Sequence, residues 1–317
     1  MQKSVSKVLI VFVLLAVVIG LLGTAKGCGQ QRLEEEEKEE EEEVITDNYT
    51  IHMIDLGLGS GESMLIKTQS GKAILIDAGD ERDLISGSNN YVANYLQSQG
   101  VTSLEAIILS HPHNDHTSML DEVINAFPVK EFIYANYDGS LDSSSAGLYA
   151  SLMALVNSKG IPTREVRSGQ RLTYDNLTFS CYSPPATFFT EDTIPGYTAA
   201  NNNSLVFRIA NNSGVTILTT GDIELEAIDY LMSTCSAELS ANIFKVPHSG
   251  SLTSLNEDFY AAISPEVSII SCPGYGDRPT QSVLDALEKI STVYRTDEDG
   301  HIIIEVEDSN YTVSTEK

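Results

Sequence analysis

An apolar run that ends in a dense group of ionisable side chains restricts the fold of this chain more than any other feature. The run Ile107–Leu109 is followed by Ser110 and then by the six residues 111–116, which read His-Pro-His-Asn-Asp-His. Three of the six histidines of the chain lie in this one segment. Four neighbouring imidazole and carboxylate groups cannot all be buried and hydrogen-bonded at low cost. A buried strand must therefore end here, and the group that follows it does not belong to an apolar core.

The spacing of these side chains predicts metal binding. His111 and His113 alternate along an extended turn and point the same way, as chelation of one ion requires, and Asp115 and His116 face a neighbouring position. Imidazole and carboxylate ligands without a thiolate suit Zn²⁺, Mn²⁺ or Fe²⁺. The alternative is a solvated loop in which the histidines cluster by chance.

The chain beyond residue 48 reads as one domain, 49–317, in which short apolar runs alternate with longer amphipathic segments. The expected strands are Ile51–Leu56, Ser63–Thr68, Ala73–Ile76, Ala106–Leu109, Phe132–Tyr134, Leu177–Tyr182, Leu205–Ile209, Thr216–Thr219, Ile243–Val246, Val267–Ile270 and Ile302–Glu305. The expected helices are Tyr91–Gln99, Met119–Ala126, Ala146–Ser158, Glu224–Met232, Leu255–Ile263 and Ser282–Ile290, and Pro184–Asn203 reads as a long loop. This rhythm is typical of an α/β chain with two sheets covered by helices.

The segment His111–His116 matches in full the HxHxDH motif of the metallo-β-lactamase superfamily, which this sequence resembles along most of residues 49–307. Three further segments resemble that superfamily and follow in its order: Ile74–Gly79, Thr219–Asp222 and Lys245–Ser251. The resemblance implies an αββα four-layer sandwich and a hydrolase that uses a metal-activated water.

Within the superfamily, the sequence is most similar to the C-terminal domain of ComEC-type competence proteins and their stand-alone relatives. The similar stretches are Met53–Gly57, Asn201–Val206, Leu218–Glu224, Lys245–Ser251, Pro265–Ser271 and Tyr294–Gly300. In this branch the middle histidine ligand is missing and an Asn-rich turn takes its region. The sequence departs from the branch in three places: a longer loop at Asp55–Ser63, Thr117 and Ser118 in place of small residues, and Ser249 where a second histidine is usual.

The resemblance implies a role for each motif residue. His111 and His113 bind one metal, Asp115 and His116 bind another together with His248, and Asp222 bridges the two. Asp115 and His248 also count as catalytic. Asp77 orients a ligand histidine, and the residues expected beside the metal or the substrate are Asn202, Asn203 and Ser249.

Each role has a simpler alternative, and the sequence leaves these open. Asp77 also suits a turn before Gly79, Asp222 a helix cap, and the asparagines a turn before a strand. His248 also suits a surface loop. The cofactor is two divalent ions, Zn²⁺ or Mn²⁺, with occupancy by a single ion as the alternative.

The first 48 residues read as targeting and linker segments. Lys3 and Lys7 precede an uncharged apolar run, residues 8–25, so residues 1–33 are expected to be a signal peptide or an N-terminal membrane anchor. Cleavage after Ala25 and lipid attachment at Cys28 are both open. Residues 34–48 contain a Glu-rich tract and are expected to be an acidic linker. The charge pattern places the chain beyond the run outside the cytoplasm, anchored or secreted in the bacterial envelope.

The charge of the chain bears on its substrate. The formal net charge is −26, and from Val44 onward 14 Lys and Arg stand against 36 Asp and Glu, a net of −22. Such a domain cannot hold nucleic acid mainly through a basic surface, although bound divalent metals supply local positive charge. The resemblance names a phosphodiester, first DNA, as the substrate. The alternatives are a small or wall-polymer phosphodiester, a β-lactam, or a non-catalytic, membrane-tethered binding protein of the same fold, and no protein partner can be inferred.

Overall fold

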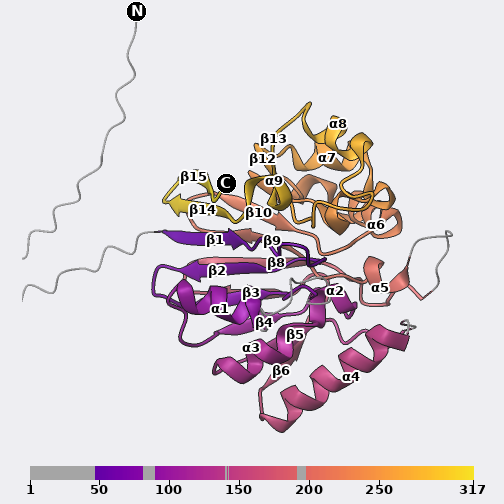
Figure 1. Ribbon diagram of the computed structural model, residues 1–317. Helices are drawn as coiled ribbons and strands as arrows, with labels where there is room; N and C mark the ends of the chain where they lie inside the picture. Colours follow the sequence, from indigo (N-terminus) through magenta and orange to yellow (C-terminus); the bar gives the residue numbers. More distant parts are fainter. Residues whose placement is uncertain (1–46, 81–89, 140, 142, 191–197) are drawn as a thin grey trace, which may run out of the picture. The chain divides into compact units, whose positions relative to one another are not determined.

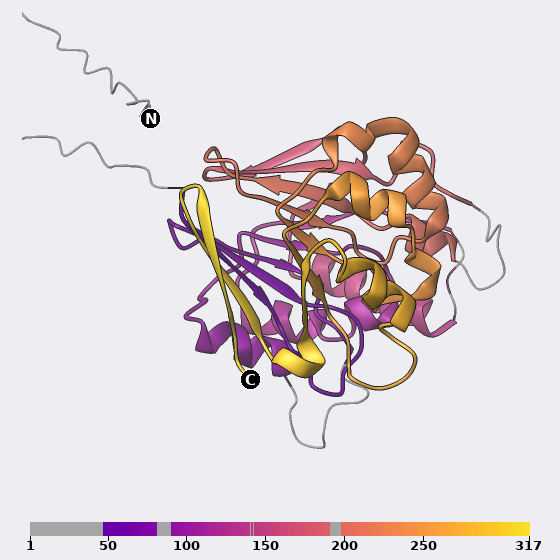
Figure 2. The same cartoon turned by 90° about the horizontal axis from the view of Figure 1, so that it is seen from above.

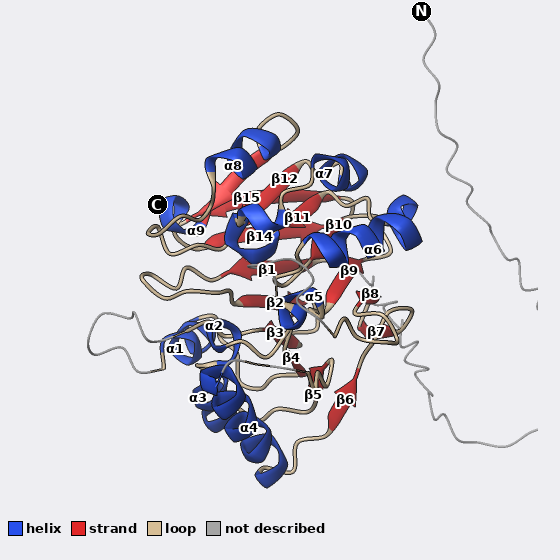
Figure 3. Cartoon of the chain, turned by 90° about the vertical axis from the view of Figure 1, so that its right-hand side faces the viewer, coloured by secondary structure: helices blue, strands red, loops and turns tan. Residues whose placement is uncertain are grey.

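Two β-sheets stack face to face in the computed structural model, and helices cover the outer face of each (Figure 3). The structure describes residues 47–80, 90–139, 141, 143–190 and 198–317. Helices α6, α7 and α8 lie on one side of the strands, and α1, α3 and α4 lie on the opposite side (Figures 1 and 3). This arrangement confirms the predicted αββα sandwich.

The first sheet has eight strands and the second has seven. In spatial order the first contains β15 (Asn310–Thr315), β14 (Ile302–Glu307), β1 (Tyr49–Met53), β2 (Met64–Thr68), β3 (Ala73–Ile76), β4 (Ala106–Ile108), β5 (Phe132–Tyr134) and β6 (Thr163–Glu165). The second contains β13 (Thr292–Arg295), β12 (Val267–Ile270), β11 (Ile243–Lys245), β10 (Thr216–Thr219), β9 (Val206–Ala210), β8 (Leu177–Ser183) and β7 (Arg171–Tyr174). The β14–β15 hairpin extends the first sheet with the last strands of the chain (Figure 2).

Helices follow most of the parallel strands. The α-helices are α1 (Tyr91–Ser98), α2 (Asn114–Thr117), α3 (Leu120–Ala126), α4 (Ser143–Ser158), α5 (Ala199–Asn202), α6 (Leu225–Cys235), α7 (Glu257–Ile263), α8 (Gln281–Leu287) and α9 (Thr296–Asp299). Three short 3₁₀ helices are η1 (Ser236–Glu238), η2 (Pro247–Gly250) and η3 (Leu252–Ser254).

Side-chain alternation along fully buried strands builds the layers. On β3, Ile74 and Ile76 enter the core between the two sheets, where they join Ile217 of β10. The intervening Leu75 packs against the helices of the first sheet, and Leu218 packs against the helices of the second. Burying each of these side chains contributes about 1.5–3 kcal/mol to stability, so every strand stabilises two cores at once.

Parallel strands in both sheets bring the predicted ligands to one edge of the sandwich. Strands β3 to β6 run parallel in the first sheet, and β10 to β13 run parallel in the second. In open α/β sheets the carboxyl ends of such strands are where ligands bind. Asp77 follows β3, His111–His116 follow β4, Asp222 follows β10 and His248 follows β11. The fold therefore gathers motifs that lie more than one hundred residues apart in the sequence.

The expected bounds agree with the structure for several strands that are buried along their whole length. The predicted bounds of Ala73–Ile76, Phe132–Tyr134, Thr216–Thr219 and Val267–Ile270 are those observed. The prediction misses the strands β6, β7, β13 and β15 and the short helices α2, α5 and α9. The interpretation of Pro184–Asn203 as a loop is wrong at its end, where Thr198 caps α5 by accepting a hydrogen bond from the Asn201 backbone at 3.1 Å.

The predictions for the first 46 residues lie outside the described residues. These are the signal or anchor segment 1–33 and most of the linker 34–48. The chain divides into one unit up to Val44 and another from Ile45 to Lys317, and the described residues all belong to the second. In the described part of the chain, no helix has both the length and the hydropathy that crossing a bilayer requires.

Candidate metal centre

The segment after β4 is shaped by a short helix. His113 is extended, with φ −75° and ψ 156°, and its carbonyl accepts hydrogen bonds from the backbone of His116 at 3.1 Å and from Thr117 Oγ1 at 3.0 Å. Successive residues of a helix point about 100° apart. His116 therefore turns inward, where its side chain is fully buried, and Asp115 stays 28% exposed. The predicted extended turn thus ends at His113.

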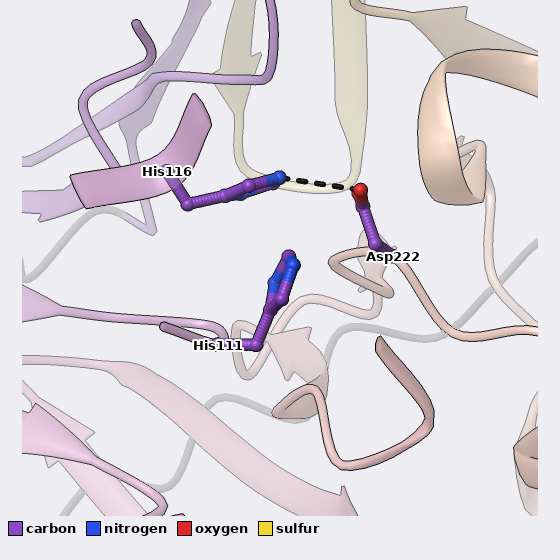
Figure 4. A group of neighbouring side chains, drawn as sticks. All are labelled: His111, His116 and Asp222. Atoms are coloured by element: carbon purple, nitrogen blue, oxygen red, sulfur yellow. Dashed lines mark ion pairs between the residues drawn. The ribbon is translucent and has the colours of Figure 1, made fainter. Parts of the chain in front are cut away.

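Three donor groups from the two sheets converge at the edge of the sandwich. Donor atoms of His111, His116 and Asp222 all lie within 4.8 Å of one another. Figure 4 shows the two imidazoles and the carboxylate pointing toward a common point, with His116 Nε2 at 3.3 Å from Asp222 Oδ2. His113 joins the group through its Nδ1, which lies 3.0 Å from His111 Nε2. The structure thus brings together histidines of the first sheet and the aspartate of the second.

A carboxylate stands behind His116. Asp77 Oδ2 lies 2.7 Å from His116 Nδ1, and both groups are fully buried. Asp77 also accepts hydrogen bonds from the Ser110 backbone at 2.7 Å and from Ser110 Oγ at 2.5 Å. With Nδ1–H donating to Asp77, the Nε2 atom of His116 is directed at Asp222. This is the place that the resemblance implied for Asp77.

A second carboxylate stands behind His248. His248 Nε2 lies 3.8 Å from Asp222 Oδ2. Its Nδ1 lies 3.1 Å from the hydroxyl of Thr253, its hydrogen-bond partner, and 3.3 Å from Glu224 Oε1. Glu224 is fully buried, and its other oxygen accepts a hydrogen bond from the Thr198 backbone at 2.7 Å. His248 has a left-handed backbone, with φ 52°, that turns its ring toward Asp222. Sequence reasoning gave Glu224 no role, although it follows Asp222 by two residues.

Burial and charge set the protonation of the centre. Burial lowers the pKa of His111 well below its usual range, and the neighbouring histidines add to this effect. Burial also opposes charge on His116, but the carboxylates of Asp222 and Asp77 outweigh it and raise the pKa of His116. Burial opposes ionisation of Asp222, but His116 and His248 hold its pKa well below the usual range. His111 is therefore neutral, the form that binds a metal, and Asp222 is a buried carboxylate.

The side chains of the asparagine turn hydrogen-bond to nearby backbone groups, and their predicted place beside the metal or the substrate stays a prediction. Asn202 Oδ1 accepts a hydrogen bond from the Glu224 backbone at 3.1 Å. The Asn203 side chain exchanges two hydrogen bonds with the Phe189 backbone, at 3.1 and 2.8 Å. Both amides are thus engaged in holding the turn before β9, which is the alternative that the sequence left open. Asn201 Oδ1 is buried and, among the described residues, has no hydrogen-bond partner.

Ser249 lies next to His248 in η2 and shares its left-handed backbone, with φ 51°. Its side chain is half-buried at the same edge of the sandwich. The prediction that it contacts the substrate stays a prediction.

The residues present fit a divalent metal ion. His116 Nε2 is buried, and within the described residues it makes no hydrogen bond, although a carboxylate oxygen lies opposite it. A proton on the nitrogen, or a metal ion in its place, would pair this buried nitrogen with the buried carboxylate. Imidazole nitrogen and carboxylate oxygen are ligands that Zn²⁺ and Mn²⁺ accept. The donor set, taken with its burial, is that of a metal centre.

Comparison with known proteins supports this assignment. Residues 56–175 match the model of the metallo-beta-lactamase superfamily, and this range contains the whole motif His111–His116. The chain is 28% identical over 267 residues to ComE operon protein 3 of Bacillus subtilis (strain 168), covering 80% of this chain and 32% of that protein. It is 27% identical over 250 residues to recombination protein 2 of Haemophilus influenzae, covering 78% and 28%. The chain has the metallo-β-lactamase fold and is similar in sequence to these ComEC-type relatives.

A solved structure shows the same fold. The metallo-β-lactamase-fold protein YhfI from Bacillus subtilis has a TM-score of 0.51 with 13% identity, covering 84% of this chain and 100% of that one. The match of residues 56–175 to this superfamily supports an enzyme of the hydrolase class. The chain spans 32% of the length of ComE operon protein 3 and 28% of the length of recombination protein 2.

Proposed function

We propose that this protein is a metal-dependent phosphodiesterase that acts outside the cytoplasm, with DNA as its first substrate. The convergence of His111, His116 and Asp222 within 4.8 Å, with His116 Nε2 buried and not hydrogen-bonded within the described residues, carries the proposal. The relatives named for competence and recombination support DNA, because both processes handle it.

The chain's own residues would hold and orient the metal. His111, His113, Asp115, His116, Asp222 and His248 are the ligands that the two sheets supply. When bound, a divalent ion supplies Lewis acidity and lowers the pKa of a water molecule so that it becomes a nucleophile near neutral pH. Asp77 and Glu224 fix the rings of His116 and His248. Asp115 keeps part of its carboxylate exposed to solvent.

The charge of the chain favours a second substrate class. The net charge of −22 beyond residue 43 repels a polyanion. Two cations at this edge of the sandwich are already engaged, since Lys245 pairs with Glu62 and Arg295 pairs with Asp297 at 2.6 Å. A smaller phosphodiester, or one in a wall polymer, meets less repulsion than DNA does.

Cleavage of end-labelled DNA tests the proposal. The full chain, purified in detergent, is incubated with single- and double-stranded DNA and added Mn²⁺ or Zn²⁺, and Asp115→Ala runs alongside to exclude a contaminating nuclease. Cleavage that the variant loses supports a nuclease. Absence of cleavage by protein that contains metal contradicts DNA as substrate and favours the smaller phosphodiesters.

The proposed location rests on the N-terminal sequence. The apolar run 8–25 follows Lys3 and Lys7 and precedes the Glu-rich tract, a pattern that favours export of the chain beyond it. Protease added to intact cells should degrade the domain if it lies outside the cytoplasm. Protection that persists until the membrane is opened would contradict this location.

A further inference from the structure

Glu62 and Lys245 form a buried ion pair that the proposed chemistry does not use. Glu62 lies in the loop between β1 and β2, Lys245 is the last residue of β11, and their side chains are 2% and 1% exposed. Burial lowers the pKa of Lys245 to about 7, and the Glu62 carboxylate beside it favours the charged ammonium. Removing two charges from water costs several kcal/mol per ion, so a buried pair destabilises the fold unless its contacts are well placed.

Lys245 contacts the backbone beside Asp222 and His248, the two ligands that follow strands of the second sheet. Its Nζ donates a hydrogen bond to the carbonyl of Gly221 at 3.0 Å. The same carbonyl accepts a hydrogen bond from the His248 backbone at 3.3 Å. Gly221 directly precedes Asp222. The ammonium therefore fixes the one carbonyl that links the two ligands of this sheet.

Glu62 reaches the half that the first sheet supplies. Its carboxylate, the Asp77 carboxylate and a nitrogen of His116 lie within 4.8 Å of one another. The loop that precedes Glu62 also packs closely against Asp115. Gly61 has φ +84°, and a Cβ atom there would overlap the carbonyl of Asp115. A residue other than glycine cannot approach Asp115 so closely.

We propose that the Glu62–Lys245 pair is a brace that sets the position of the two halves of the metal centre relative to each other. Glu62 holds the side of Asp115 and His116, and Lys245 holds the side of Asp222 and His248. The proposal rests on the metal centre described under the proposed function. We treat both as positioning residues, because neither belongs to the His111, His116 and Asp222 group that carries the proposed function.

The direction in which Lys245→Met changes the affinity for a cation distinguishes a brace from a purely electrostatic effect. Lys245→Met removes a positive charge beside several carboxylates, and by charge alone this change should strengthen the binding of a cation. If the pair is a brace, Lys245→Met should instead weaken cation binding, because the two halves of the metal centre lose their fixed spacing. The double variant Glu62→Gln with Lys245→Met removes both charges and leaves the net charge unchanged, so it reports the loss of the brace alone.

Zn²⁺ affinity is the direct measurement. The full chain, stripped of metal, is titrated with Zn²⁺ against a competing chelator, and the thermal unfolding of the metal-free protein is recorded in parallel. We expect Lys245→Met and the double variant to bind Zn²⁺ about 10–100-fold more weakly, the range for partners that orient metal ligands. Lys130→Met is the matched control, since Lys130 pairs with Glu105 at 2.7 Å on the exposed surface and should change nothing.

Three results would overturn the inference. Unchanged or tighter Zn²⁺ binding by folded Lys245→Met would do so, and so would unchanged binding by the double variant. The double variant carries the test if Lys245→Met does not fold, because neutral replacement of a buried ion pair is often tolerated. Wild-type protein that binds no Zn²⁺ would overturn the metal centre itself, and the brace with it.

Discussion

The two metal positions that the family resemblance implies differ in what stands behind their histidines. At the position assigned to Asp115, His116 and His248, the Asp77 carboxylate lies 2.7 Å from His116 Nδ1. His248 Nδ1 lies 3.1 Å from the hydroxyl of Thr253 and 3.3 Å from the Glu224 carboxylate. At the position formed by His111 and His113, the group behind His111 is the Ser110 hydroxyl, at 3.1 Å.

This difference predicts unequal metal binding. A carboxylate behind a histidine fixes the tautomer and makes the ligand more basic, and losing such a partner typically costs 10–100-fold in affinity. A hydroxyl does less. We therefore expect the Asp115–His116–His248 position to hold its ion more tightly than the His111–His113 position. We expect both positions to share Asp222, because donor atoms of Asp222, His111 and His116 lie within 4.8 Å of one another.

Removing the shared carboxylate should have the largest effect. Asp222→Ala takes a ligand from both positions, so both ions should be lost. Turnover should fall by more than 100-fold, the upper end of the loss typical for a residue that only orients a metal ligand. Metal analysis of the purified variant and its turnover check this. Retention of one ion would show that the positions do not share Asp222.

Removing one ligand from each position should separate them. Asp115→Ala and His113→Ala should each abolish turnover and leave the fold largely intact, but Asp115→Ala should lose the tighter ion and His113→Ala the weaker one. Graded chelation followed by metal analysis distinguishes the two cases. Unchanged activity in either variant would contradict the metal assignment.

Removing a carboxylate from behind a histidine should have an intermediate effect. Glu224→Gln keeps the shape of the side chain but removes its charge, so Zn²⁺ affinity at the His248 position should fall by about 10-fold or more. Glu257→Gln is the matched control, since Glu257 is 70% exposed on α7. Equal Zn²⁺ affinity in the two variants would contradict the role assigned to Glu224.

Substitution of Ser249 should have the smallest effect. Losing one hydrogen bond to a substrate costs about 0.5–1.5 kcal/mol, so Ser249→Ala should raise KM by roughly 2- to 12-fold and leave metal content unchanged. Steady-state kinetics with metal analysis test this. Lost metal would place Ser249 among the groups that hold the ions.

Burial decided how much of the fold could be predicted from the sequence. The strand Ala73–Ile76 is buried along its whole length, and an apolar run of four residues is visible in the sequence. Strand β6, Thr163–Glu165, is exposed along its whole length and belongs to the sheet edge. Strand β15 is also an edge strand and has no fully buried residue. Backbone pairing defines β6, and in β15 only the partly buried Tyr311 and Val313 pack against the core, so both strands leave a weak signal in the sequence.

The candidate site was predictable where its residues are contiguous. The six residues His111–His116 show their chemistry directly, and resemblance to a family added Asp222 and His248. Glu224, Glu62 and Lys245 carry charges that look ordinary in the sequence. Their importance comes from burial beside the ligands, and burial depends on packing between residues far apart in the chain.

Anomalous diffraction at the zinc edge, from crystals of the full chain grown with Zn²⁺, tests the central claim most directly. The account predicts a peak about 2.0–2.1 Å from His116 Nε2 that is also bonded to Asp222. Zinc bound elsewhere on the chain, with no peak between His116 and Asp222, would contradict it.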